Sequence, residues 1–187
     1  MSLKSNYKNK VLVTFLFSVF IYSSFFSQKN KVINREKIYS FLNSTISIDT
    51  IRFNLSAKTD FGMFDEDVLE YFNDSFFNPE DSVFLLNQFQ KSQYLKWQKG
   101  KINGAKIISK RHIKHIFRSD NGWLKFRKQY GDCLSYFSLP IFTKNDEYCI
   151  FYYWTQCDYL AGGGRLNLYQ FKDGKWIFIK TYISGVS

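Results

Sequence analysis

Residues 169 to 178 read Tyr-Gln-Phe-Lys-Asp-Gly-Lys-Trp-Ile-Phe, and this stretch decides the fold. Two runs of alternating side chains flank Asp173 and Gly174, a residue pair that readily adopts the positive φ angles of a two-residue type I′ turn. Such a turn would pair Lys172 with Lys175 and return the chain antiparallel to itself. The sequence therefore predicts a β-hairpin close to the carboxyl end of the chain.

The register of this hairpin places large side chains opposite one another. Cross-strand contacts between aromatic side chains stabilise antiparallel sheets, so this register is a favourable one. The predicted pairs are Phe171 with Trp176 and Tyr169 with Phe178 on an aromatic face, and Leu168 with Ile179 on the other face.

Alternating side chains upstream extend the hairpin into a sheet. The predicted strands are residues 133–143, 147–157, 165–172 and 175–183. Both alternating faces are apolar between Tyr148 and Trp154, which is typical of a central strand covered on both sides. The predicted fold class is α+β, with a C-terminal four-stranded antiparallel β-meander packed against short N-terminal helices.

Helix signals precede this sheet. Asn78 and Pro79 form a strong start signal, Ser109 can cap a second helix, and Gly131 can end a third. A shorter helix is expected near residues 34–42. The predicted buried faces are Leu85, Leu86 and Phe89 on the first helix, Ile113, Ile116 and Phe117 on the second, and Trp123, Phe126 and Tyr130 on the third.

The composition indicates one globular domain. The chain has 187 residues, of which 45% are hydrophobic and 20% aromatic. Lys, Asn, Ile, Phe and Tyr are abundant, which is the bias of an AT-rich genome, so the aromatic excess alone does not indicate a function. No repeat or linker divides the chain after its first residues, and residues 28–187 are expected to form a single α+β domain.

The N-terminus resembles an export signal. Residues 1–10 are basic, residues 11–26 are apolar, and Ser27 offers a small residue at a cleavage site, although Phe25 is large for that position. We expect residues 1–27 to be a signal peptide and the protein to be periplasmic or secreted. The alternatives are a retained N-terminal membrane anchor and a buried strand.

Charge is unevenly distributed along the chain. The net charge is +10, and it is +7 without residues 1–27, which carry three lysines and no acid. Residues 60–81 hold eight acids and no base, whereas residues 91–128 hold twelve bases and only Asp120 as an acid. A basic stretch can bind nucleic acid or an anionic surface, but it can also face the acidic stretch or solvent. We expect no nucleic-acid partner, and a membrane contact only through residues 11–26 if they are retained.

His112 and His115 are the only histidines, and their spacing on a predicted helix would allow them to share a metal ion. No third ligand is indicated, and both lie off the apolar face, so a solvated pair is favoured and no metal site is expected. Any hydrolase-type arrangement would have to use one of these two residues.

Gly162, Gly163 and Gly164 resemble a phosphate-binding loop only superficially, because they lead into a predicted strand and not into a helix. They are interpreted as a flexible, strained connection between strands. Glycines let a ligand approach the backbone closely, so a binding role is possible here. Tyr159 and Arg165 are then the first side chains to test.

Three cysteines are an odd number for an exported chain. The hairpin expected at residues 144–147 brings Cys133 opposite residue 157 or 158. A Cys133–Cys157 disulfide would leave Cys149 buried, and three reduced, buried thiols are the alternative. The apolar strand around Cys149 argues against a catalytic thiol.

A longer series of landmarks resembles a known type of protein. It comprises Asp81 and Gln88 on the capped helix, Tyr130-Gly131, Phe137 to Phe142, Cys157, the glycine run, and Asp173 to Trp176. This series is similar to small exported proteins of unknown function from AT-rich Gram-negative bacteria, and the likeness covers roughly residues 80–187. That pattern commonly has a second Cys four residues after the first, where this chain has Ala161. The resemblance implies no activity.

These observations favour an exported, non-catalytic domain that binds an unidentified protein or small molecule through its sheet or its glycine segment, without a cofactor. No catalytic residue is predicted. An exported hydrolase that uses His112 or His115 is the alternative from another class, and an N-terminally anchored envelope protein is the third.

Overall fold

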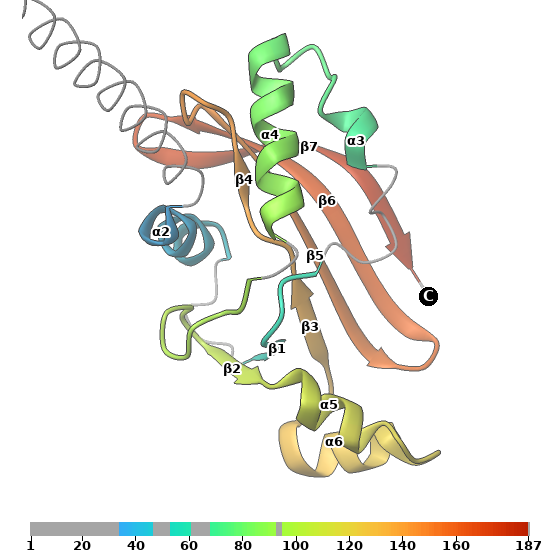
Figure 1. Ribbon diagram of the computed structural model, residues 1–187. Helices are drawn as coiled ribbons and strands as arrows, with labels where there is room; N and C mark the ends of the chain where they lie inside the picture. The colour runs from blue at the N-terminus through green and yellow to red at the C-terminus, as the bar shows by residue number, and fades with distance from the viewer. Residues whose placement is uncertain (1–33, 47–52, 61–67, 93–94, 187) are drawn as a thin grey trace, which may run out of the picture. The chain divides into compact units, whose positions relative to one another are not determined.

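A mixed β-sheet runs through the described part of the chain (Figure 1). The structure, a computed structural model, describes residues 34–46, 53–60, 68–92 and 95–186. The predicted leader, residues 1–27, lies outside these residues, so its cleavage or retention stays a prediction. No helix among the described residues is long and apolar enough to cross a membrane.

Seven strands make up this sheet, in the order β2-β1-β3-β5-β6-β7, with β4 pairing to β5 beside β3. The pairs β1–β2 and β1–β3 are parallel, and the remaining pairs are antiparallel. The strands are β1 (Phe53–Ser56), β2 (Ala105–Ile108), β3 (Leu134–Phe137), β4 (Ile141–Phe142), β5 (Tyr148–Asp158), β6 (Ala161–Lys172) and β7 (Lys175–Val186).

The α+β class is confirmed, but the four-stranded antiparallel meander is wrong in two respects. β1 and β2 join the sheet in parallel beside β3, which makes the sheet mixed. The strand predicted at residues 133–143 is also divided into β3 and β4. Pro140 lies in the gap and has no N–H to donate to a neighbouring strand. There Ser138 pairs with Tyr152 instead, since its N–H donates to the Tyr152 carbonyl and its Oγ accepts from the Tyr152 N–H, both at 2.9 Å.

The β6–β7 hairpin forms as predicted around its turn. Asp173 and Gly174 have φ angles of 52° and 77°, and Lys172 pairs with Lys175. The aromatic pairs of the predicted ladder are also confirmed. The predicted pair of Leu168 with Ile179 is wrong, because Leu168 pairs with Lys180.

Two extra residues in β7 explain this shift. The register of β6 against β7 skips Ile179 and, further along, Tyr182. Each skipped residue is a β-bulge, which lets neighbouring side chains leave on the same face of a strand. Tyr182 and Ile183, although adjacent, accordingly both pack against the same apolar cluster.

Five helices accompany the sheet in the described residues. Two of them start at the local signals predicted, since Asn78 Oδ1 accepts from the Asp81 N–H at 2.8 Å and Ser109 Oγ accepts from the His112 N–H at 3.2 Å. Gly131, with φ 105°, ends the last one as predicted. The helices are α2 (Arg35–Thr45), α3 (Val68–Tyr71), α4 (Pro79–Ser92), α5 (Lys110–Ile116) and α6 (Gly122–Tyr130).

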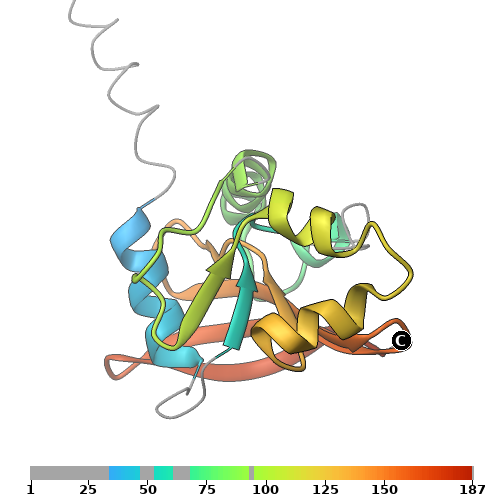
Figure 2. The ribbon, with the colours of Figure 1, turned by 90° about the horizontal axis from the view of Figure 1, so that it is seen from below.

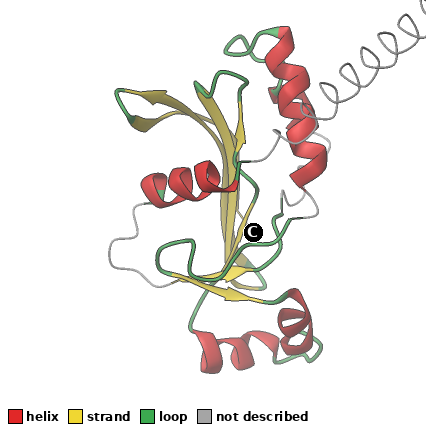
Figure 3. Ribbon diagram, turned by 60° about the vertical axis from the view of Figure 1, so that its left-hand side comes forward, coloured by secondary structure: helices red, strands yellow, loops and turns green. Residues whose placement is uncertain are grey.

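α2 and α4 cover opposite faces of the sheet (Figure 3). On one face Phe41 of α2 is fully buried, with its ring edge-on to Phe151 at 5.6 Å and to Tyr169 at 5.3 Å. On the other face Leu85 and Phe89 of α4 belong to a cluster with side chains from β4, β5 and β6. β5 therefore has both faces covered along its first half, as predicted. The α4-side partners in that cluster are Ile141, Ile150, Tyr152, Leu166 and Leu168.

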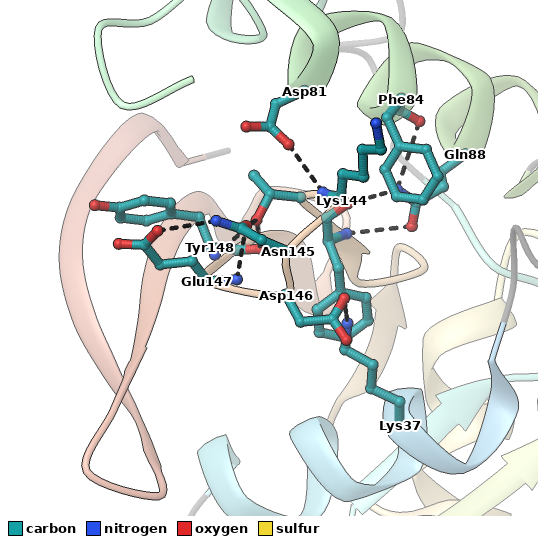
Figure 4. Close-up of polar contacts among 11 residues, drawn as sticks. Lys37, Asp81, Phe84, Gln88, Lys144, Asn145, Asp146, Glu147 and Tyr148 are labelled. Carbon is teal, nitrogen blue, oxygen red and sulfur yellow. Dashed lines mark hydrogen bonds and ion pairs between the residues drawn. The ribbon is translucent and has the colours of Figure 1, made fainter. Parts of the chain in front are cut away.

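Polar side chains fix α4 to the β4–β5 hairpin (Figure 4). The Gln88 amide pairs with the backbone of Phe142, donating to its carbonyl at 2.5 Å and accepting from its N–H at 3.2 Å. The Gln88 amide thus satisfies the N–H and the carbonyl of Phe142 as a neighbouring strand would. Asp81, on the same helix face, accepts from the Lys144 N–H at 2.9 Å. Asp81 and Gln88, two of the three buried polar residues of α4, are therefore structural partners of the hairpin.

An ion pair ties the connection between α3 and α4 to β7. Asp74 binds Lys180, whose ammonium also lies over the rings of Phe76 and Tyr182. Burial raises the pKa of the Asp74 carboxyl, but hydrogen bonds, chiefly from Lys180 and Ser75, outweigh burial and hold this pKa below its ordinary value of 3.8. The folded state therefore favours the ionised carboxylate.

Candidate functional site

A groove opens on the α2 face of the sheet, beyond the end of that helix. Its floor comes from β3, β5 and β6, and its walls come from the end of α2, from β1 and from the turn between α6 and β3. Its volume is about 650 Å³, within the range of about 300–1,000 Å³ typical of small-molecule sites. Residues 47–52, which join the groove residues Ile46 and Phe53, lie outside the described part of the chain.

Aromatic rings form the apolar part of this groove. Phe137 and Phe151 are almost fully buried in the floor, with ring centroids 5.4 Å apart. Phe53 leans on Phe137 from β1 at 5.6 Å, and Tyr153 continues the floor along β5. The rings are held by the strands that carry them, so the floor is formed before any ligand arrives.

Small polar side chains lie beyond the rings. Ser135 and Thr155 are cross-strand partners whose hydroxyls share a hydrogen bond of 3.0 Å. At the wall, buried Asn54 donates from Nδ2 to the Tyr130 carbonyl at 3.1 Å and to the Cys133 carbonyl at 3.0 Å. These two hydrogen bonds hold the turn between α6 and β3 against β1. The groove thus combines an aromatic floor with a few fixed hydroxyls.

Tyr169, the groove residue of β6, is joined by hydrogen bonds to Asn167 of β6 and through it to Thr181 of β7. Thr181 Oγ1 donates to Asn167 Oδ1 at 2.8 Å, and Asn167 Nδ2 donates to the Tyr169 hydroxyl at 3.2 Å. Burial raises the pKa of the Tyr169 phenol, and the hydrogen bond from Asn167 only partly opposes this. Tyr169 is therefore neutral in the groove at physiological pH.

The interpretation of Gly162–Gly164 as a flexible, strained connection is wrong. All three lie inside β6, where they pair with Gln156, Thr155 and Trp154 of β5, and none has a positive φ angle. The close packing of Trp154 explains Gly164, because a Cβ there would lie 2.7 Å from Trp154 Cε3. Their predicted binding role stays a prediction.

Tyr159 and Arg165, the other predicted binding residues, lie apart from each other. Tyr159 is in the tight turn between β5 and β6, where its hydroxyl donates to the Asp120 carbonyl at 3.2 Å. Arg165 is exposed on β6 and pairs with Tyr153, so its side chain projects from the same face of the sheet as the groove. Arg165 is therefore a neighbour of the groove, whereas Tyr159 belongs to the α6 side of the molecule.

Cys133 and Cys157 are joined by a disulfide, and Cys149 is a free, buried thiol. This is the pairing that the hairpin register suggested. The disulfide links the groove wall at the start of β3 to the end of β5, and Arg127 reinforces that end by donating to the Cys157 carbonyl at 2.9 Å and pairing with Asp158. Burial raises the pKa of the Cys149 thiol well above its ordinary value, so this thiol is an inert core residue.

The two histidines lie on α5 and do not line the groove, although His112 contacts the lining residue Tyr130. His112 packs edge-on against Tyr130 at 5.7 Å and approaches Gln129 Oε1 at 3.4 Å, while His115 is exposed. Neither histidine pairs with a carboxylate or a thiol within the described ranges. In the same ranges no three His, Cys, Asp or Glu side chains gather as a metal site would require.

The sequence did not point to the groove. Of its aromatic floor, only Phe151 and Tyr153 fall in a stretch that was predicted to be covered on both sides, and its walls come from segments far apart in the chain. One signal was present: the groove-facing residues of β5 change from Phe151 to Tyr153 and Thr155, and burial decreases along the strand in the same direction. Tyr153 and Trp154, the last residues of the stretch predicted to be covered on both sides, are accordingly only partly buried.

Comparisons with known proteins add no relative: no family model, no curated protein and no solved structure matches the chain. The likeness to small exported proteins of unknown function thus stays a prediction.

Proposed function

We propose that the protein is an exported, non-catalytic binding domain whose groove takes a small, largely apolar ligand. The single observation that carries this proposal is the groove of about 650 Å³ with its aromatic floor and its few fixed hydroxyls. Ligand sites typically combine such an apolar lining with a small number of oriented polar groups. Rings held by β-strands lose little freedom on binding, which favours affinity.

Two features favour binding over catalysis. The described lining of the groove contains no histidine, and its one cysteine, Cys133, is held in the disulfide. Its carboxylate, Asp132, is exposed at the rim. A hydrolase-type site would need a nucleophile and a base within hydrogen-bond reach of each other.

Export is supported by the disulfide as well as by the leader-like N-terminus. Disulfides persist in the periplasm and outside the cell, whereas cytosolic thiols are kept reduced. Mass spectrometry of the protein recovered from the cell envelope tests this part. A mature N-terminus at Gln28 would support cleavage, and an intact chain held in the membrane would support the anchored alternative.

Binding is tested with a neutral fluorescent probe, N-phenyl-1-naphthylamine, whose emission rises in apolar sites. The variant Thr155→Trp fills the groove, because the cross-strand neighbours of Thr155 are the small residues Ser135 and Gly163. We expect saturable probe binding by the wild type and at least about tenfold weaker binding by this variant, which corresponds to about 1.4 kcal/mol.

Gln156→Trp is the matched control, since Gln156 is the next residue of β5 and its side chain leaves the opposite face. It should bind the probe as the wild type does. Equal binding by Thr155→Trp and Gln156→Trp would place the probe outside the groove and contradict the proposal.

A further inference from the structure

Seven of the twelve bases of the stretch 91–128 lie on α5, on α6 and on the connection between these helices. The helices lie side by side at one end of the sheet (Figure 2). Six exposed side chains form this basic face: Lys110, Arg111, Lys114, Arg118, Lys125 and Lys128. Their spacing along α5 and α6 leaves the apolar side chains of the same helices to pack inward around Trp123 and Phe126.

Among the described residues, none of the six bases of this face forms an ion pair with an acid of the stretch 60–81. Within the described residues, Asp74 pairs with Lys180 and Glu80 pairs with Lys144, both outside the basic face. The ion pair at this end of the molecule, between Arg127 and Asp158, does not use any of the six bases. The positive potential of the face is therefore available to a partner from outside the molecule.

Exposed apolar side chains accompany these bases. Leu124 of α6 is 51% exposed, and the turn between β5 and β6 presents Tyr159 at 55% and Leu160 at 87%. The Tyr159 ring packs edge-on against Trp123 at 6.4 Å, so the turn is held beside α6. Large apolar residues and bases thus share one end of the molecule.

This combination fits the surface of an anionic phospholipid bilayer. Lysine and arginine bind anionic headgroups, while leucine and tyrosine side chains enter the interface between headgroups and acyl chains. A nucleic acid would use the bases but offers no apolar phase for Leu160. We propose that the basic face, with Leu124, Tyr159 and Leu160, docks the protein on an anionic membrane surface. This inference does not depend on the groove, and it replaces the expectation that a membrane contact would come only through residues 11–26.

Vesicle flotation of the full chain tests this proposal, with neutral phosphatidylcholine vesicles compared with vesicles that also contain anionic phosphatidylglycerol. The test variant carries Lys110→Glu, Lys114→Glu and Arg118→Glu. Each base near an anionic surface is worth about 1 kcal/mol, or about fivefold in partitioning, and the new carboxylates add repulsion, so we expect binding to anionic vesicles to weaken by more than about 100-fold. The leader is present in every variant, so its contribution cancels in the comparison.

A control variant with the same change in charge carries Lys91→Glu, Lys172→Glu and Lys175→Glu, all at exposed sites away from the basic face. It should bind as the wild type does. Leu160→Ser should weaken binding to anionic vesicles several-fold without changing its salt dependence. The charge-dependent part of binding should be lost at about 1 M salt, where the Debye length is about 3 Å.

Three results would overturn the proposal. The first is an equal loss of vesicle binding in the test and control variants, which would mean that binding depends on the net charge of the protein and not on the basic face. The second is unchanged binding of the test variant. The third is binding to duplex DNA or RNA that exceeds vesicle binding at the same salt and is insensitive to Leu160→Ser, which would assign the face to nucleic acid.

Discussion

Gly164→Ala should destabilise the protein, whereas Gly163→Ala, one residue earlier, should not. A Cβ on Gly164 would lie 2.3 Å from the Tyr153 carbonyl oxygen, 2.7 Å from Trp154 Cε3 and 2.9 Å from Trp154 Cα. Two of these atoms belong to the backbone of β5, which cannot rotate away. A Cβ on Gly163 meets Gly185 O at 3.4 Å, an ordinary contact.

The magnitude follows from this crowding. Forcing an extra methyl group into a packed site typically costs about 1–3 kcal/mol, and backbone neighbours place Gly164→Ala near about 3 kcal/mol. That is a large share of a stability of about 5–15 kcal/mol. For a chain of this size, about 1 kcal/mol shifts the melting temperature by about 2–4 °C, so we expect a decrease of about 6–12 °C. Gly163→Ala should be neutral or stabilise by about 0.5 kcal/mol, because alanine loses less backbone entropy on folding.

The assay is thermal unfolding followed by circular dichroism, with urea unfolding as the second measurement, both under non-reducing conditions. The two variants differ by one position and have identical composition, so their comparison isolates the packing of Trp154 on β6. Equal melting temperatures for the two variants would refute this account of the glycine segment.

Three further predictions concern the contacts around the sheet. Cys133→Ser should lower the free energy of unfolding by about 3 kcal/mol, because the disulfide to Cys157 closes a loop with a sequence separation of 24; urea unfolding measures it. Gln88→Ala should cost about 2–4 kcal/mol by leaving two buried backbone groups unsatisfied, whereas exposed Asn87→Ala should cost less than about 0.5 kcal/mol in the same assay. Asp74→Asn should make stability less sensitive to acid below about pH 4, measured by urea unfolding across pH.

The sign of the pH effect follows from the lowered pKa of Asp74. Its ion pair contributes stability above the unfolded value of 3.8 and loses that contribution as the pH falls through the lower folded value. Identical acid limbs for wild type and Asp74→Asn would contradict this reasoning. If dithiothreitol did not lower the free energy of unfolding of the wild type, the prediction for Cys133→Ser would be wrong. If Gln88→Ala and Asn87→Ala cost the same free energy of unfolding, the prediction for Gln88 would be wrong.

Local signals predicted the elements whose cause is local. Asp173-Gly174 needs positive φ angles, and the capping residues Asn78 and Ser109 act within one helical turn, so turn and helix starts lie where the sequence placed them. The suggested partners Cys133 and Cys157 likewise depend on the register of two neighbouring strands. The shift at Ile179 could not be predicted, because it depends on packing against α4.

Long-range partners account for what the sequence could not predict. β1 and β2 have only four residues each, and their place beside β3 depends on pairing with residues far along the chain. The groove depends on that same placement, since Phe53 of β1 forms one of its walls. Its position therefore could not be read from any single segment, even though every ring in it was visible in the sequence.

The bulges in β7 also affect what happens at high protein concentration. β7 is the edge strand of the described sheet on its antiparallel side, and twelve residues with free backbone groups would be a template for fibril growth. The bulges at Ile179 and Tyr182 break the regular alternation of inward- and outward-facing backbone groups along β7. A strand from another molecule could therefore pair with at most four consecutive residues of β7 in register. The same irregularities that fit β7 to its own core thus guard the protein against amyloid-like stacking.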